Sequence, residues 1–358
     1  MNSSIDIGFQ KRIKLEIDRT RNKQRKQRHV LQQLFWECTL KCNLNCQHCG
    51  SDCKFNALQK DMPFEDFLPV LDDVATLYNP RNVLVITIGG EPLVRPDIVE
   101  CGREITRRGF MWGMVSNGMA LSSAKLDELM DAGLLTIAIS LDGFEDDHNW
   151  MRGNPHSFER AVQSIRTLAK RRITWDVITC VNRRNYGSLD KFKNFLLSIG
   201  VHKWRIFTVF PNGRARGNDE LQLNTDEMHG LMDFIVKTRQ EKQIQLSYSC
   251  EGFLGNYEYE VRDYPFFCQA GINVASILCD GSISGCLSIR SNYNQGNIYH
   301  DRFTDVWQNK FQQYRNHSWM RTGQCADCGV WRYCEGNGMH LRDEDGSLLM
   351  CNLHRIYS

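Results

Sequence analysis

Short apolar stretches alternate with amphipathic ones over most of the first 250 residues. Six runs rich in Val, Ile and Leu have the length of strands, and the segments between them repeat apolar positions at helical spacing. Strands this short and this apolar are typical of a parallel sheet covered on both faces. The expected strands are 34–39, 83–88, 111–116, 134–140, 173–181 and 203–209, and the expected helices are 64–78, 97–108, 122–132, 157–170 and 188–199.

This alternation predicts an α/β fold. Right-handed crossovers would curl six βα units into an open barrel. A complete eight-unit barrel usually takes about 250 residues, more than the regular pattern spans. We therefore expect a partial (β/α)6 barrel over residues 31–245. After it the alternation stops, and glycines, aromatics and cysteines dominate a second expected domain, residues 246–358.

The first 30 residues form a basic arm in front of the barrel. They contain nine Lys or Arg against three acidic residues, and few large apolar side chains. Two interpretations stay open. The arm is either a solvated helix or frayed segment, or a docking surface for an acidic leader peptide.

Composition narrows the class of protein. Hydrophobic residues make up 42% and charged residues 24% of the 358, as in ordinary globular proteins, and the net charge of +2 gives no reason to expect a nucleic acid partner. No apolar run approaches the roughly 20 residues of a membrane span, and the N-terminus lacks the apolar core of a signal peptide. Fifteen cysteines in such a chain point to metal or redox sites in the cytoplasm rather than to disulfides.

Three cysteines directly after the first expected strand have the spacing C-x3-C-x2-C: Cys42, Cys46 and Cys49. Three thiolates on one short loop can hold three corners of an iron–sulfur cube. A zinc site or a redox disulfide also fits the bare spacing. If the nearby Cys38 or Cys53 supplied a fourth thiolate, the cube would instead be an ordinary electron carrier.

Other candidate residues follow the next expected strands. The carboxyl ends of parallel strands collect active-site residues, and paired glycines let a ligand approach the backbone closely. Plain turns and a surface ion pair are the alternatives. The candidates are Gly89, Gly90, Glu91 and Pro92 after the second strand, Ser116 and Asn117 after the third, Ser140 after the fourth, and Arg152 beyond it. Arg205 and residues 211–217 follow the sixth strand, and the sequence assigns them no role.

The cysteine spacing, His48 before the last cysteine and Gly-Gly-Glu-Pro one βα unit later resemble the radical S-adenosylmethionine (SAM) superfamily. The resemblance implies that Cys42, Cys46 and Cys49 hold a 4Fe-4S cluster whose open iron binds SAM. It implies that the strand-end residues above bind SAM, with Ser140 and Arg152 at its carboxylate. A low-potential donor such as flavodoxin or ferredoxin would reduce the cluster, and SAM cleavage would give a 5′-deoxyadenosyl radical that takes a hydrogen atom from a substrate.

The C-terminal cysteines resemble the SPASM extension of that superfamily. The pattern runs Cys268, Gly281 and Cys286, then a cluster of three cysteines and a last one. The resemblance implies an outer auxiliary iron–sulfur cluster. Four thiolates in a tetrahedral zinc site are the alternative. The residues of this outer set are Cys325, Cys328, Cys334 and Cys351.

A second, inner auxiliary cluster is less complete. It would take Cys268, Cys286 and the upstream Cys250, but the pattern's fourth cysteine falls at Gly338. The inner cluster therefore has an open iron, borrows His340, or is absent. The remaining cysteines, Cys101, Cys180 and Cys279, are expected in the core.

The resemblance implies a peptide or small protein as substrate, with a cross-link as the leading expectation and epimerisation as another. Sulfatase maturases of this type place an Asp base after the second inner cysteine. Here Leu287 follows Cys286, which argues against formylglycine formation. Residues 31–351 also resemble a subgroup encoded beside small lipoprotein-like proteins. A small-molecule substrate and a non-catalytic zinc or iron–sulfur protein stay open, and no catalytic acid, base or hydrogen donor is identified.

Overall fold

The computed structural model describes residues 5–289 and 292–357. One ten-stranded sheet runs through it in the order β10-β9-β8-β1-β2-β3-β4-β5-β6-β7. Pairing is parallel from β8 through β7, and antiparallel between β8 and β9 and between β9 and β10. The strands are β1 Gln33–Thr39, β2 Leu84–Gly89, β3 Met111–Ser116, β4 Leu134–Ser140, β5 Thr174–Val181, β6 Lys203–Thr208, β7 Gln245–Tyr248, β8 Val274–Ile277, β9 Ser282–Ser284 and β10 Gly296–Asn297.

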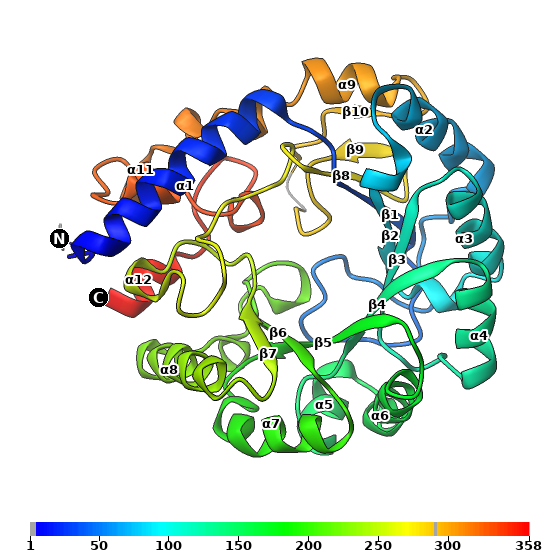
Figure 1. The fold of residues 1–358 in the computed structure, drawn as a ribbon, viewed down its shortest axis with the longest axis horizontal. Helices are drawn as coiled ribbons and strands as arrows, with labels where there is room; N and C mark the ends of the chain where they lie inside the picture. The colour runs from blue at the N-terminus through cyan, green and yellow to red at the C-terminus, as the bar shows by residue number, and fades with distance from the viewer. Residues whose placement is uncertain (1–4, 290–291, 358) are drawn as a thin grey trace.

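The sheet curves into an open barrel, with helices α2 to α8 on its outer side (Figure 1). This is the expected α/β fold, and each of the six expected strands is a strand in the structure. The helices are α1 Phe9–Arg28, α2 Phe64–Leu77, α3 Ile98–Arg107, α4 Ser123–Asp131, α5 Glu145–Arg152, α6 Ser157–Leu168, α7 Leu189–Ser198, α8 Thr225–Glu241, α9 Phe303–Asn309, α10 Gln312–Arg315, α11 Trp331–Cys334 and α12 Asn352–Tyr357.

The barrel extends one unit further than six strands. Helix α8 leads into β7, a seventh parallel strand paired with β6. Asn224 and Glu227 form a reciprocal capping box at the start of α8, so the sequence did carry a signal for this helix. Strand β7 has only four residues, too few for a clear alternation. The division into domains at residue 245 stays a prediction.

Three buried tryptophans anchor the core between sheet and helices. Trp36 stacks on Phe67 of α2 at 4.6 Å between ring centroids. Trp112 donates its indole N–H to Thr87 Oγ1 at 3.2 Å, a hydroxyl on the neighbouring strand. Trp204 makes the equivalent bond, 2.8 Å long, to Thr179. Each of the latter two rings buries a large apolar area while its one polar group keeps a partner.

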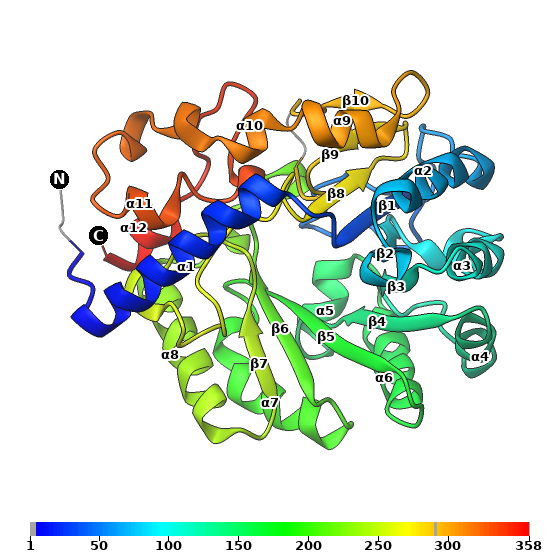
Figure 2. The same cartoon turned by 45° about the horizontal axis from the view of Figure 1, so that its top comes forward.

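The C-terminal part continues the barrel sheet. Strand β8 pairs in parallel with β1 from Gln33 opposite Val274 to Trp36 opposite Ile277. The basic arm is a helix, α1, which lies beside α11 (Figure 2). Tyr333 donates to Glu16 at 2.8 Å. Residues 9–28 therefore form a helix with one face docked on the C-terminal part, and the binding of a leader peptide by this arm stays a prediction.

Over the residues that the structure describes, none of the helices combines the length and the apolar character needed to cross a membrane.

We expect Gly102→Ala to destabilise the protein. A Cβ at Gly102 in α3 would overlap the indole ring of Trp112, which is fully buried. Alanine favours a helix over glycine by about 1 kcal/mol, but overpacking a core costs about 1–3 kcal/mol. The thermal unfolding midpoint should therefore fall. Gly187→Ala is the control, because no atom lies within 4 Å of a Cβ built there. Equal midpoints for the two variants would contradict this packing argument.

Candidate active site

A cavity of about 170 Å³ lies where the cysteine loop meets the carboxyl ends of the strands. The loop follows β1, and Cys42, Cys46 and Cys49 all line the cavity. Six of the eight strand-end candidates line it as well. These are Gly89, Gly90, Ser116, Asn117, Ser140 and Arg152. Parallel strands therefore bring together residues spread over more than 100 positions of sequence.

Glu91 and Pro92, the other two candidates, do not line this cavity. Glu91 is fully buried, and its carboxylate accepts hydrogen bonds from Ser116 Oγ at 2.8 Å and from the Asn117 N–H at 2.7 Å. Pro92 begins a short 3-10 helix. In this structure the Glu91 carboxylate holds the turn after β3 without lining the cavity itself. Its expected contact with SAM stays a prediction.

The paired glycines let the cysteine loop approach β2 closely. A Cβ at Gly89 would overlap the Thr39 carbonyl, and one at Gly90 the Lys41 carbonyl. Gly89 also has φ +134°, which L side chains rarely adopt. The Gly90 N–H donates to Thr39 O at 2.7 Å. The first role of this Gly-Gly pair is therefore to seat the loop that carries the cysteines.

Arg152 places a fixed positive charge at the cavity. Its Nε donates to Asp142 Oδ2 at 2.6 Å, and its Nη1 lies 3.8 Å from Cys46 Sγ. Burial disfavours the charged guanidinium, but Asp142 and Cys46 outweigh burial and raise the pKa of Arg152. Asp142 is held in turn by the Cys180 N–H at 2.9 Å. Arg152 is thus a buried cation beside the sulfur of one of the three cysteines.

Arg214 is a site residue that the sequence left without a role. Its Nε donates to Cys46 O at 2.7 Å and its Nη1 to Asn45 Oδ1 at 2.7 Å, so it clamps the cysteine loop. Its Nη2 is buried without a hydrogen-bond partner, and the residue lines the cavity. Arg205, by contrast, is paired with Asp176. The sequence did contain a signal that Arg214 lies at the site, because this residue stands among glycines just beyond the end of a predicted strand.

The three thiols differ in acidity. Burial raises the pKa of Cys42 to about 12. Burial also raises the pKa of Cys46, although the nearby Arg152 opposes it. Cys49 is the exception, because a hydrogen bond with the Cys53 thiol outweighs burial and lowers its pKa to about 5. His48 is partly buried, and desolvation of its ring lowers its pKa to about 4, so the ring is neutral.

The donor set fits an iron–sulfur cluster. In the described part of the chain no three His, Cys, Asp or Glu side chains converge closely enough to hold one metal ion. The thiols instead border a shared space, as a cluster requires when each thiolate binds a different iron. The positive charge of Arg152 and Arg214 beside them complements thiolate ligands. Cys53 shares the cavity and, with its N–H 3.3 Å from Cys49 Sγ, supports the loop.

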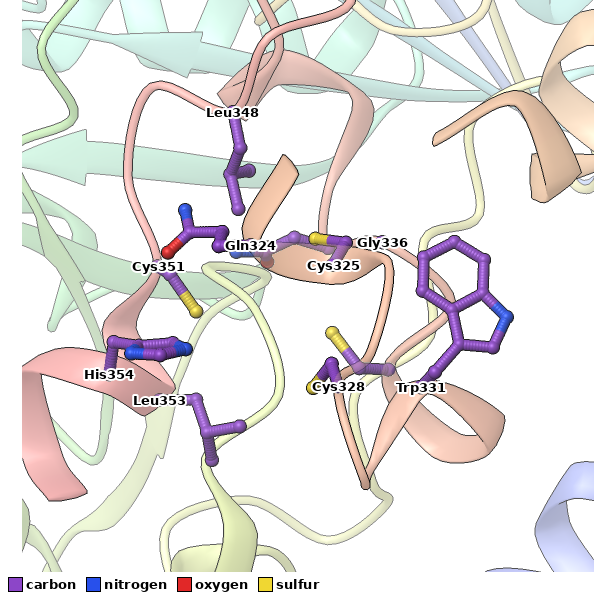
Figure 3. A pocket seen from close by; sticks show the side chains of 11 residues that line it. Gln324, Cys325, Cys328, Trp331, Gly336, Leu348, Cys351, Leu353 and His354 are labelled. Carbon is purple, nitrogen blue, oxygen red and sulfur yellow. The ribbon is translucent and has the colours of Figure 1, made fainter. Parts of the chain in front are cut away.

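The outer set of C-terminal cysteines borders a narrow pocket between α11 and α12. Figure 3 shows the sulfur atoms of Cys325, Cys328 and Cys351 facing the same space, which Cys334 also lines. Burial, followed by the other cysteines of the set, raises the pKa of Cys334. Arg342 is buried and donates to Cys325 Sγ at 3.3 Å. The structure thus brings the four expected residues together around one pocket.

The inner set also comes together. Cys250 follows β7, Cys286 follows β9, and Cys268 lies between these strands in the sequence. Although Cys250 is exposed as a residue, desolvation of its thiol and the nearby Cys286 and Cys268 raise its pKa to about 12.

Cys279 lies apart from this set, and its N–H donates to Glu37 Oε2 at 3.1 Å. Cys279 and Cys101 are buried as expected, whereas Cys180 is only partly buried.

We expect Cys49 to be the first cysteine of the loop to react in metal-free protein. At pH 7 a thiol of pKa about 5 is a thiolate, while Cys42 with a pKa of about 12 stays protonated. Alkylation of Cys49 by iodoacetamide should slow as the pH falls through 5. Cys53→Ala should raise the pKa of Cys49 and slow its alkylation at pH 6. Peptide mapping by mass spectrometry checks both, and equal rates for Cys42 and Cys49 would contradict them.

Comparisons with known proteins agree with this geometry. The family model of the radical SAM superfamily matches residues 36–196, and that of the SPASM iron–sulfur cluster-binding domain matches residues 268–329. An AdoMet-dependent heme synthase of Methanosarcina barkeri is 26% identical over 84% of this chain and 89% of its own. The mycofactocin maturase MftC of Mycobacterium tuberculosis is 29% identical over 86% of this chain and 78% of its own.

Among solved structures, native anSMEcpe with bound AdoMet and Cp18Cys peptide superimposes with a TM-score of 0.70. It is 17% identical, and the match covers 92% of this chain and 94% of that one. This likeness supports the fold over most of the chain. The chain therefore carries a radical SAM domain over residues 36–196 and a SPASM iron–sulfur cluster-binding domain over residues 268–329.

Proposed function

We propose that this protein is a radical SAM enzyme that takes a hydrogen atom from a peptide or small protein during its maturation. One observation carries the proposal. Three cysteines, a glycine pair and a buried arginine line a single cavity at the carboxyl ends of the strands. Enzymes of this family use SAM and a 4Fe-4S cluster, and SPASM domains bind auxiliary clusters. When bound, the cluster and SAM supply a 5′-deoxyadenosyl radical as the hydrogen acceptor.

Arg152 and Ser140 are proposed to hold the carboxylate of SAM. Both line the cavity, and Asp142 fixes Arg152 through Nε. A guanidinium has four other N–H donors; one of them faces Cys46 Sγ, and the others are available for a carboxylate. The buried His148 accepts the Asp142 N–H at 3.0 Å on Nδ1, and burial lowers the pKa of His148 to about 3. A neutral His148 leaves Arg152 as the cation next to Asp142.

Ser116 and Asn117 are proposed to form part of the cavity wall, and Glu91 to hold them in place. The Ser116 hydroxyl and the Asn117 N–H are both engaged by the Glu91 carboxylate. The Asn117 side chain donates to Asn43 Oδ1 at 2.8 Å, so this turn is also tied to the cysteine loop. These residues keep the cavity walls in a fixed position, which is what orienting one carbon of SAM toward one hydrogen requires.

Two observations support a peptide substrate, and a third narrows the reaction. The relative MftC is a maturase, and the similar anSMEcpe structure contains a peptide. Leu287 follows Cys286, where sulfatase maturases have an Asp, so the proposed reaction is not formylglycine formation. Helix α1 exposes Phe9, Ile13 and Ile17, one turn apart, on a basic segment that suits an acidic leader peptide. A low-potential donor such as flavodoxin or ferredoxin, and a cytoplasmic location, belong to the same proposal.

A second candidate is a small-molecule substrate. The AdoMet-dependent heme synthase relative aligns over more of its own length than MftC does. A heme precursor is a small molecule, and an enzyme for such a substrate has no need of a peptide-docking surface.

Deuterium transfer separates the two candidates. The source organism is grown in heavy water, and its extract is divided by size into peptide and small-molecule fractions. Each fraction is added to the reconstituted enzyme with unlabelled SAM and dithionite. Deuterium in 5′-deoxyadenosine from the peptide fraction, lost after protease digestion of that fraction, supports the peptide proposal. Protease-resistant transfer from the small-molecule fraction overturns it in favour of the second candidate, and transfer from neither contradicts both.

We expect Arg152→Lys to weaken binding of SAM but not of decarboxylated SAM. Lysine keeps the charge and loses the planar fork that matches a carboxylate. Losing a charged hydrogen bond costs about 1.5–3 kcal/mol, or about tenfold to a hundredfold in Kd. Equilibrium dialysis with both ligands measures this. Arg171→Lys is the control, because Arg171 pairs with Asp127 on the surface. Equal losses for the two ligands would mean that Arg152 does not contact the SAM carboxylate.

A further inference from the structure

The inner set of cysteines has three members, one fewer than a cluster with only thiolate ligands needs. The thiol of Cys286 lies near those of Cys250 and Cys268, and Cys268 lies near Cys250. The SPASM pattern places its fourth cysteine at position 338, where this chain has glycine. The inference below rests on the proposed inner cluster and asks which group of this chain completes it.

Position 338 lies beside the inner set. The backbone N–H of Met339, the next residue, lies near the Cys268 thiol. A Cβ built on Gly338 would stand 3.7 Å from the backbone oxygen of Cys250. The segment from 338 to 340 therefore borders two of the three cysteines, and a side chain at 338 would begin next to the inner set.

His340 takes up the space that a side chain at 338 would need. A Cβ on Gly338 would lie 2.7 Å from His340 Cε1 and 2.9 Å from Nδ1, closer than real Cβ atoms come to another side chain. Phe210 packs edge-on against the imidazole at 5.1 Å between centroids and holds it there. A cysteine at 338 and this position of the His340 ring exclude each other.

The His340 ring has the properties of a metal ligand. The residue is 7% exposed. Among the described residues no hydrogen bond to either ring nitrogen is found. A buried imidazole whose nitrogens make no hydrogen bond to the protein has a nitrogen lone pair available for iron.

We propose that His340 completes the inner auxiliary cluster through a ring nitrogen, together with Cys250, Cys268 and Cys286. Glycine at 338 is then the compensating change, because it removes the thiolate and makes room for the imidazole. Replacing a thiolate by a neutral ligand lowers the negative charge of the cluster. Its reduction potential is therefore higher than that of the same cluster with four thiolates. Histidine ligands raise the potential of Rieske centres in the same way.

Pulsed electron paramagnetic resonance tests the ligand directly. The parent protein carries Cys42→Ala, Cys46→Ala and Cys49→Ala, which leaves only auxiliary clusters, and is labelled with ¹⁵N-histidine and reduced with dithionite. We expect a strongly coupled histidine nitrogen in the parent, its loss in His340→Ala and its retention in His354→Ala. His354 is the matched control, since it lines the pocket of the outer set, where four cysteines are present.

Gly338→Cys combined with His340→Ala keeps the test decisive if His340→Ala alone fails to fold. The alanine removes the ring that would overlap the new side chain, so this double variant should hold about eight irons in the parent background. It should show no coupled nitrogen and a lower potential for one cluster.

Four results would overturn the proposal. One is a parent without a coupled histidine nitrogen, and another is a nitrogen signal that His340→Ala leaves unchanged. The third is a parent with only about four irons, meaning one auxiliary cluster. A spectrum of the parent that changes on adding a cysteine peptide would identify an open iron in place of the imidazole. Neither SAM nor substrate is present, so failure of the peptide proposal would not alter these readouts.

Discussion

The close contact between the cysteine loop and the end of β2 is the constraint on which the site depends. Gly89 and Gly90 let the backbone of residues 39–41 lie directly against their own, in a space that any larger residue would fill. Hydrogen bonds from Gly90 and Glu91 to Thr39 and Lys41 fix that contact. The same short segment continues into the Glu91 carboxylate, which holds the turn after β3. One backbone contact thus sets both the place of the cysteines and one wall of the cavity.

The sequence was a good guide to the barrel because apolar periodicity is local. The six expected strands required only runs of Val, Ile and Leu, and the strand-end rule then placed Ser116, Ser140 and Arg152 near the cysteine loop. The rule could not separate residues that face a cavity from residues that support it. Glu91 is an example, since its burial depends on the turn of a neighbouring strand. Arg214 was undecided for the same reason, because its partners in the cysteine loop lie about 160 residues earlier in the sequence.

For the C-terminal part of the chain, the spacing of cysteines was the sequence signal in place of apolar periodicity. That spacing predicted an outer set, whose four cysteines line one pocket, but it contained no information on β8, whose partner β1 is more than 230 residues away. Helix α1 illustrates the same limit. Its charge pattern predicted a solvated surface, whereas the bonds of Glu16 and Asp18 to Tyr333 and Tyr259 depend on tertiary structure. Position 338 showed a missing thiolate in the sequence, and only the structure showed what fills its place.

The parallel pairing of β8 with β1 has a consequence for how the two parts of the chain can be separated. Without β8, the first barrel strand, β1, would be an edge strand with one row of its backbone N–H and C=O groups unpaired. That strand also carries the apolar side chains of Leu34 and Trp36. Unprotected edges of this kind recruit strands from other molecules and lead to aggregation. The barrel is therefore not a self-sufficient module to which the cysteine-rich part was added. Truncation before β8 would remove a structural strand along with the auxiliary cysteines.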